Sequence, residues 1–458
     1  MNIVILGAGQ VGRTVATSLA KEQSNNVTLV DNNPEKLADL SDKLDIRTVI
    51  GHASHPDTLE RAGANEAEMI IALTNSDELN IVACEVAHAL FEKTGKKAKK
   101  IARIRATEYY SSNLFSEDYL SVDLVINPEA IITEYISELI KYPGALQVLE
   151  FADGKIRMVG ARAHHEGALV GKPLKEISEH IPDIDSRFVT IYRQGEGIIP
   201  DGSTIVSPGD EVFFIAARKD IKSVLSEVRK LDDPIKRIVI AGGGNIGRRL
   251  AKQLESQYDV KIIEKNLEQA KKLSEALDST IVLHGDAANE ELLLEEQIEK
   301  TDIFVAVTDA EEANILSSML AKRLGAKKVI ALINKPAYSE LLSGDTIDIA
   351  ISPLHIMLGV VLEQVRKGDV VKVYSLRRGS AEAIEAIAHG NKSTSEVVGR
   401  MIDDIKLPEG ATISAILRND QVLMAHHDTV IRENDHVILF ISKKEHIHDV
   451  EKLFESKY

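Results

Sequence analysis

The chain has 458 residues and a formal net charge of −16, because 71 Asp and Glu outnumber 55 Lys and Arg. This balance argues against nucleic-acid binding and against a basic patch that binds anionic lipid, since both need clustered positive charge. A single Cys excludes a disulfide framework and a Cys-rich metal site.

The N-terminus and the apolar runs indicate where the protein works. No apolar run approaches the ~20 residues that a membrane span requires. The first residues lack the basic region of a secretion signal and lead directly into a predicted strand. We therefore expect a soluble, cytoplasmic protein without a lipid anchor, and the length favours about two to four domains.

Each half of the chain begins with short Val- and Ile-rich runs that alternate with helical patterns. In the first half the runs lie at 2–9, 26–31, 47–51, 69–74, 100–104 and 123–128. This alternation predicts βαβ units in a doubly wound, Rossmann-like parallel sheet that is covered on both faces. After 143–144 and again after 367–368, short strands such as 187–193 and 210–217 are separated by Gly and Pro turns. They predict a small α+β domain behind each sheet.

The two halves repeat one another. Five segments recur in the same order at a nearly constant offset: 7–12 at 242–247, 27–31 at 260–264, 72–81 at 306–315, 123–129 at 348–354 and 170–177 at 398–405. A period of about half the chain is too long for a solenoid unit and indicates a duplicated pair of domains. We expect four domains, at 1–142, 145–229, 235–366 and 369–453. The apolar helical stretches 131–141 and 354–366 are expected to be core helices, which would also pack two such domains together.

A glycine-rich turn follows the first strand of each half. Gly7, Gly9 and Gly12 would allow a tight turn, a close approach of backbone to a pyrophosphate and close helix–strand packing, respectively. Asp31, at the end of the second strand, can accept a hydrogen bond from a ribose 2′-OH and would repel the 2′-phosphate of NADP. The second half repeats this pattern with Gly242, Gly244, Gly247 and Glu264. The alternative is a turn that only packs a helix on a sheet; repetition with an acid in both copies favours binding of NAD or another adenosine nucleotide.

Further polar residues follow the later strands. Thr74-Asn75 and Thr308-Asp309 are expected at the carboxyl edge of each sheet, where ligands of open α/β sheets bind. Their alternative role is to cap the next helix. Arg103 aligns with Leu332 in the second half. It is either a solvated strand-end charge or a phosphate ligand in the first site alone.

Candidates for catalysis and metal binding are few. His52 and His55 are the only His residues close to the first glycine turn, and the second copy has no His there. They define the rival hypothesis, an NAD-dependent oxidoreductase with His52 or His55 as its acid–base group. The pairs His164-His165 and His426-His427 lie in strand-like segments, where neighbouring side chains face opposite sides, so we expect no metal site. Cys84 is expected to be a small core residue.

These motifs resemble the nucleotide-binding RCK/KTN domain of potassium transport regulators, in both halves. The stretches 171–177 and 202–216, and likewise 399–413 and 433–441, resemble the companion RCK C-terminal domain. The order N–C–N–C in one chain is typical of the peripheral NAD-binding subunits of bacterial Trk-type K⁺-uptake systems, as is the stretch 375–386.

The resemblance implies a regulator rather than an enzyme. Such domains form a homo-oligomeric ring at the cytoplasmic face of the inner membrane, beneath an integral membrane K⁺ transporter, and nucleotides change the shape of the ring. NAD(H) is the implied ligand; ATP and ADP offer the same ribose 2′-OH. A scaffold whose pockets are vestigial is the third hypothesis.

The resemblance also implies which residues bind the nucleotide. In the first site they are Gly7, Ala8, Gly9, Gln10, Val11 and Gly12 at the pyrophosphate, Asp31 at the ribose, and Thr74, Asn75 and Arg103. In the second they are Gly242, Gly243, Gly244, Asn245, Ile246, Gly247, Glu264, Thr308 and Asp309. One departure concerns the family motif Gly-Asp-Ala, which is intact at 285–287 but has His52 in place of Asp in the first half. The two sites therefore need not share affinity or preference.

Overall fold

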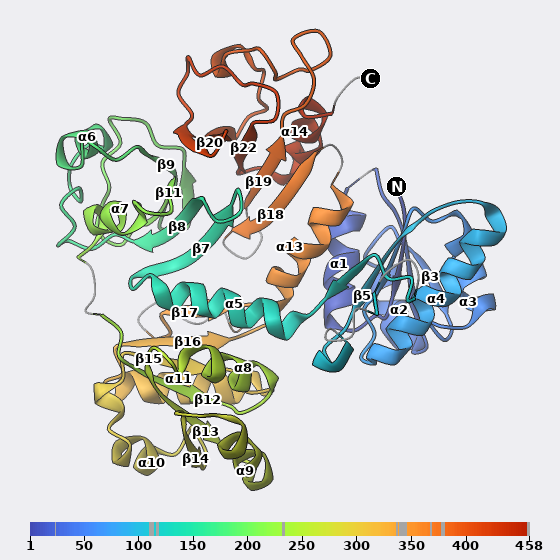
Figure 1. Ribbon diagram of the computed structural model, residues 1–458, viewed down its shortest axis with the longest axis horizontal. Coiled ribbons are helices and arrows are strands. Elements are labelled where there is room, and N and C mark those ends of the chain that lie inside the picture. The colour runs from blue at the N-terminus through green and yellow to red at the C-terminus, as the bar shows by residue number, and fades with distance from the viewer. Residues whose placement is uncertain are drawn as a thin grey trace. The chain divides into compact units, whose positions relative to one another are not determined.

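The computed structural model describes residues 1–22, 24–109, 114–115, 119–230, 234–335, 338, 346–366, 369–376 and 381–455. The chain forms two compact units, Met1–Ile131 and Ile132–Tyr458, shown as a ribbon in Figure 1. The second predicted boundary between a parallel sheet and its small α+β domain, at 367–368, lies outside the described residues. So does part of the stretch 375–386.

The first unit contains a six-stranded parallel sheet with the order β3-β2-β1-β4-β5-β6. Its strands confirm the six predicted runs: β1 Asn2–Leu6, β2 Asn26–Asp31, β3 Arg47–Ile50, β4 Met69–Ala72, β5 Lys99–Arg103 and β6 Leu124–Ile126. Its α-helices are α1 Gln10–Ala20, α2 Pro34–Ser41, α3 Pro56–Arg61 and α4 Asp77–Thr94. All four residues of β4 are buried, as expected for a strand covered on both faces.

The second unit begins its own parallel sheet at β12, with the order β14-β13-β12-β15-β16-β17. The strands are β12 Arg237–Ala241, β13 Asp259–Glu264, β14 Ile281–His284, β15 Ile303–Ala306, β16 Lys328–Leu332 and β17 Ile349–Ile351. The helices are α8 Asn245–Leu254, α9 Leu267–Ala276, α10 Glu290–Glu295 and α11 Glu311–Arg323. Both sheets have the doubly wound order in which ligands bind between the first and fourth strands, where the winding reverses.

Two five-stranded antiparallel sheets complete the second unit, with the orders β10-β9-β11-β8-β7 and β18-β19-β22-β20-β21. The first comprises β7 Ala145–Phe151, β8 Ile156–Arg162, β9 Ser186–Arg193, β10 Glu196–Ile198 and β11 Glu211–Ala217, with helices α6 Ile177–His180 and α7 Ile221–Val228. The other comprises β18 Val370–Leu376, β19 Ala381–Ile387, β20 Ala411–Arg418, β21 Gln421–Met424 and β22 His436–Ile441, with helix α14 Ile447–Leu453. The predicted fold, two Rossmann-like sheets each followed by a small α+β domain, is confirmed.

The two antiparallel sheets share one hydrophobic core. Phe151 and Leu149 of the first sheet are buried in a cluster with Leu376 and Phe440 of the other, and the ring of Phe151 meets that of Tyr374 edge-on at 5.1 Å between centroids. Hydrogen bonds accompany this packing: the Tyr374 hydroxyl donates to the Glu150 carbonyl over 2.9 Å. The small domains of the two halves are thereby joined directly.

Helix α5, Pro128–Lys141, begins in the first compact unit and continues into the second. Its residues Ile132 and Ile136 lie in one buried cluster with Ile240 and Val305 of the second Rossmann sheet. Gln253 of α8 donates to the Glu134 carboxylate of α5 over 3.1 Å. The other predicted stretch forms α13, Pro353–Val365. Across the described part of the chain, no helix combines the length and apolar character that would let it cross a membrane.

Each antiparallel sheet contains the same arginine–aspartate ion pair, in which the carboxylate is buried. Arg193 donates to both carboxylate oxygens of Asp210, over 3.0 and 2.8 Å, and Arg418 donates to both oxygens of Asp435, over 2.8 and 2.7 Å. Asp210 and Asp435 are 3% and 1% exposed. Such two-point pairing is the strong form of an arginine–carboxylate contact.

We expect Asp435→Asn to destabilise the second antiparallel sheet by about 2–3 kcal/mol, because it leaves the partly buried Arg418 guanidinium without its charged partner. Differential scanning calorimetry on the full chain would measure this as a lowered unfolding temperature. Glu409→Gln is the control, since the Glu409 carboxylate pairs with Lys443 at the surface, where ion pairs contribute little. Equal effects of the two substitutions would contradict the prediction.

Candidate functional site

The glycine turn of the first half has the geometry that the sequence predicts. Gly7 has a φ of +106°, a conformation that favours glycine. A Cβ on Gly12 would lie 1.9 Å from the Gly7 carbonyl oxygen, whereas a Cβ on Gly9 would meet no atom within 4 Å. The first and third glycines are therefore needed by the turn itself, and the second leaves the backbone open on its outer side.

The second half repeats these three environments. Gly242 has a φ of +108°, a Cβ on Gly247 would lie 1.9 Å from the Gly242 oxygen, and Gly244 is open on its outer side. Helices α1 and α8 start immediately after Gly9 and Gly244, and no side chain among the described residues caps either start. Both helix N-termini can therefore direct backbone N–H groups at an anion.

The two predicted acids accept hydrogen bonds from the backbone of the glycine turns. Asp31 accepts hydrogen bonds from the Ala8 N–H over 2.7 Å and from the Asn33 N–H over 2.8 Å. Glu264 accepts corresponding bonds from Gly243 and Asn266, each over 2.7 Å. A carboxylate offers about four acceptor positions, so two backbone bonds leave capacity for a ribose hydroxyl.

The length of the acid explains a difference between the turns. A Cβ on Gly243 would lie 2.8 Å from a Glu264 carboxylate oxygen and 2.3 Å from a Leu273 methyl. In the first half the shorter Asp31 leaves room for the methyl group of Ala8, which is 1% exposed. The residue in the turn is thus matched to the acid that contacts it: Gly243 occurs with the longer Glu264, and Ala8 with the shorter Asp31.

Two buried asparagines position the predicted threonines. Asn80, which is 0% exposed, accepts from the Thr74 N–H over 2.9 Å and from its hydroxyl over 2.7 Å, and donates to the Arg103 carbonyl over 2.8 Å. Asn314 makes the same contacts with Thr308 and with the Leu332 carbonyl over 3.1 Å. Neither asparagine is among the site residues predicted from the sequence, although they occupy equal positions in the repeated segments 72–81 and 306–315.

The alternative role of the Thr74-Asn75 and Thr308-Asp309 segments, as helix caps, is wrong. Helix α4 is capped by Ser76, whose hydroxyl accepts from the Leu79 N–H over 3.2 Å, and α11 begins after Ala310. Asn75 and Asp309 are exposed instead at the carboxyl edge of their sheets.

Arg103 ends β5 at the carboxyl edge of the first sheet. Its Nε is buried without a hydrogen-bond partner in the described part of the chain, and burial together with the neighbouring Arg105 charge lowers the pKa of its guanidinium. Arg105, by contrast, donates to the Asn75 carbonyl over 2.5 Å and lies 3.7 Å from the Asp77 carboxylate. An anionic ligand would relieve the cost of keeping Arg103 charged and partly buried.

His52 and His55 lie together beyond β3, with ring centroids 4.6 Å apart, and both are exposed. Strand β3 is the outer edge of the sheet, next to β2, which carries Asp31. In such folds the acid at the end of the second strand binds the adenosine ribose, and the two histidines lie on the side of the sheet that carries this acid. A hydride-transfer base must instead be placed beside the nicotinamide.

The replacement of Asp by His52 changes the side-chain contacts of the loop that follows. Asp286 in the second half accepts from the Ala288 N–H over 2.9 Å and pairs with Lys265 over 2.9 Å. The Ala288 bond first, and then the Lys265 contact, lower the pKa of that carboxyl. His52 Nδ1 instead lies 3.1 Å from the hydroxyl of Ser54. The two loops are thus held by different chemistry.

The remaining predictions have mixed outcomes. Cys84 is fully buried, and burial raises the pKa of its thiol to about 12, which confirms a core role. The expectation that strand geometry separates each His pair is wrong, because His164-His165 and His426-His427 follow the ends of β8 and β21 in loop and turn segments.

The paired turns, acids and strand orders define a chain with two dinucleotide-type Rossmann domains, each followed by a small α+β domain. The TrkA-N domain family matches residues 3–128 and 238–353, and the TrkA-C domain family matches 158–229 and 392–455. The chain is 53% identical, over 99% of both chains, to the Trk system potassium uptake protein TrkA of Vibrio alginolyticus. It is 46% identical, again over 99% of both, to that of Haemophilus influenzae. The chain therefore belongs to the TrkA family.

Solved structures show the same fold. The GsuK RCK domain superposes with a TM-score of 0.61 at 18% identity, covering 98% of this chain and 94% of that one. The GsuK channel bound to NAD gives a TM-score of 0.61 at 16% identity, covering 98% of this chain and 79% of that one. These likenesses confirm the expected fold.

We expect Gly243→Ala to destabilise the second Rossmann domain by about 1–3 kcal/mol, because the added methyl overpacks against Glu264 and Leu273. Adding Glu264→Asp, which restores the Ala–Asp pairing of the first half, should recover part of that loss. Thermal unfolding of the single and double variants would measure both effects. A double variant less stable than Gly243→Ala alone would contradict the matched-pair explanation.

Proposed function

We propose that the chain is a nucleotide-sensing regulatory subunit of a Trk-type K⁺-uptake transporter and binds NAD(H) at two sites. The observation that carries this proposal is the duplicated arrangement of an open glycine turn, an uncapped helix N-terminus and an acid at the end of the neighbouring strand. It occurs twice in a chain of the TrkA family. ATP and ADP are further ligands on this proposal, because they present the same ribose and phosphate groups.

In the first proposed site, the backbone of Gly7, Ala8, Gly9, Gln10, Val11 and Gly12 surrounds the pyrophosphate, and Asp31 binds the adenosine ribose. Thr74 and Asn75 contact the ligand at the end of β4, and Arg103 neutralises phosphate charge. The second site uses Gly242, Gly243, Gly244, Asn245, Ile246, Gly247, Glu264, Thr308 and Asp309. Leu332 stands where the first site has Arg103, so we expect weaker binding of highly charged phosphates there.

The proposed subunit is not an enzyme. A dehydrogenase would need His52 or His55 beside the nicotinamide, whereas on the proposed binding mode the strand that they follow, β3, lies on the adenosine side of the sheet. Sensing needs only that the nucleotide binds one conformation more tightly than another. A typical coupling of about 1–3 kcal/mol changes affinity roughly 5- to 150-fold.

The proposed partner is the integral membrane subunit of the transporter, which a homo-oligomeric ring of this chain would contact from the cytoplasmic face of the inner membrane. The identity to Trk system proteins supports this partner. The division into four domains at 1–142, 145–229, 235–366 and 369–453 is part of the proposal, with α5 and the shared antiparallel core as the links between halves.

Isothermal titration with NADH, NAD⁺, ATP and ADP tests the sites. Asp31→Asn and Glu264→Gln keep one acceptor oxygen but lose the charge, and each should weaken nucleotide binding at its own site by about tenfold. Each variant serves as the control for the other, since the unaltered site should keep its affinity. No heat with any nucleotide would favour a scaffold, and steady oxidation of NADH with a small substrate would favour an oxidoreductase.

Potassium flux through the transporter co-purified with this chain tests the regulatory role. In proteoliposomes the flux should depend on nucleotide concentration, and in the Asp31→Asn/Glu264→Gln variant this dependence should move to about tenfold higher nucleotide concentration, because both sites then bind more weakly. The double variant must still co-purify with the transporter. Flux that ignores every nucleotide in the wild-type complex would contradict the proposal.

A further inference from the structure

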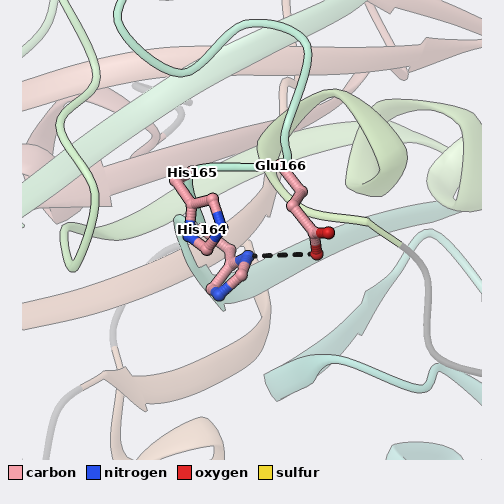
Figure 2. A group of neighbouring side chains, drawn as sticks. All are labelled: His164, His165 and Glu166. Atoms are coloured by element: carbon pink, nitrogen blue, oxygen red, sulfur yellow. Dashed lines mark ion pairs between the residues drawn. The ribbon is translucent and has the colours of Figure 1, made fainter.

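Three consecutive side chains at the end of β8 form a cluster away from both glycine turns. His164, His165 and Glu166 each offer a ligand atom, and these atoms all lie within 4.8 Å of one another. Figure 2 shows the Glu166 carboxylate directed at His164, with the His165 ring beside that of His164. The two imidazole centroids are 4.0 Å apart. We propose that this cluster binds a first-row divalent transition ion, with Zn²⁺ as its reference ligand.

The distances suit such an ion. Zn²⁺ binds imidazole nitrogen at about 2.0–2.1 Å and carboxylate oxygen at about 2.0–2.2 Å, so neighbouring ligands of a tetrahedral site lie about 3.4 Å apart. His164 Nδ1 and a Glu166 oxygen are already 3.5 Å apart. The other pairs of ligand atoms are at most 4.8 Å apart. Rotation of these exposed side chains can shorten that distance to the spacing of a bound ion. Three protein ligands leave a fourth position for water.

The backbone that carries these ligands is fixed at both ends. The His164 N–H donates to the Val228 carbonyl over 3.1 Å, the Gly167 N–H donates to the His164 carbonyl over 2.8 Å, and Leu169 N–H donates to the Glu227 carbonyl over 2.9 Å. A Cβ on Gly167 would lie 2.3 Å from the Val228 oxygen, so only glycine allows this turn to sit so close to the end of α7. The ligand backbone is thus preorganised, which lowers the entropic cost of binding.

The electrostatic setting also favours a cation. The cluster lies at the C-terminal end of α7, where the helix dipole is negative. The side chains are exposed, so an ion can enter from solvent. Lys230 lies 3.8 Å from a Glu166 oxygen, and this exposed ammonium is the group that a metal ion would replace.

The ligand set discriminates between metals. Imidazole ligands favour Zn²⁺, Ni²⁺ or Cu²⁺, whereas Mg²⁺ and Ca²⁺ require oxygen ligands. In the second half, His389 follows β19 as His164 follows β8, but Gly390 and Asn391 stand next to it. His389 lies 3.8 Å from the Asp369 carboxylate. The second half therefore offers a matched comparison that lacks the second imidazole.

Titration of the full chain with ZnCl₂, followed by calorimetry and by competition with a chromophoric chelator, tests the site. We expect one saturable site per chain at 164–166. His164→Gln, His165→Gln and Glu166→Gln should each weaken it by about tenfold or more, since even outer-shell partners of a metal contribute that much. His389→Gln should leave the affinity unchanged, and a millimolar excess of Mg²⁺ should not displace Zn²⁺.

Three results would overturn the inference: no saturable binding by the wild type, unchanged affinity in the His164→Gln/His165→Gln variant, or loss of binding in His389→Gln. Circular dichroism and the NADH isotherm of each variant would show that the chain is folded. Because these controls do not involve the loop at 164–166, failure of the metal site and failure of the nucleotide sites are distinguishable.

Discussion

The hydrogen bond from a backbone N–H in the glycine turn to the acid of the neighbouring strand is the contact on which the rest of each Rossmann domain depends. Asp31 holds Ala8 at 2.7 Å and Glu264 holds Gly243 at 2.7 Å. The bond fixes the turn against the end of the second strand, and this fixes where the following helix begins. The helix N-terminus and the open side of the middle glycine then face the same edge of the sheet, where an anion gains from both.

The two halves keep this contact but differ in a buried ion pair that joins a helix to an antiparallel strand. Arg157 of β8 pairs with Glu138 of α5 over 2.8 Å, whereas in the second half the strand carries Glu382 and its partner Arg366 follows helix α13, at 3.1 Å. Both pairs are almost fully buried. Each buried arginine is thus compensated by a carboxylate from a neighbouring element, as a buried charge requires.

The sequence predicted those features that depend on local spacing and repetition. All six strands of the first Rossmann sheet follow from continuous apolar runs, the second sheet follows from the repeated segments, and the roles of Gly7 and Gly12 follow from their spacing. The roles of Asn80 and Asn314 were not predicted, because their partners, the carbonyls of Arg103 and Leu332, belong to another strand that only the fold brings near. The contact of His164 with Glu166 was not predicted for a different reason. An extended strand was expected at these residues, but the chain turns before Gly167. Periodicity indicates which face a side chain occupies, but it does not show where a strand stops.

The proposed regulation by nucleotide needs an element that reaches from one compact unit into the other, and α5 meets this requirement. At its start, Asn127 donates to the Arg105 carbonyl over 3.2 Å and accepts from the Ala130 N–H over 2.8 Å, so the helix is tied to the segment just beyond β5. Further along, its apolar side chains enter the core of the second Rossmann sheet. A phosphate bound by Arg103 would act on the segment that anchors this helix. Coupling between distant sites requires an element whose position both sites bias, and the chain passes from the first site to the second core through this one helix.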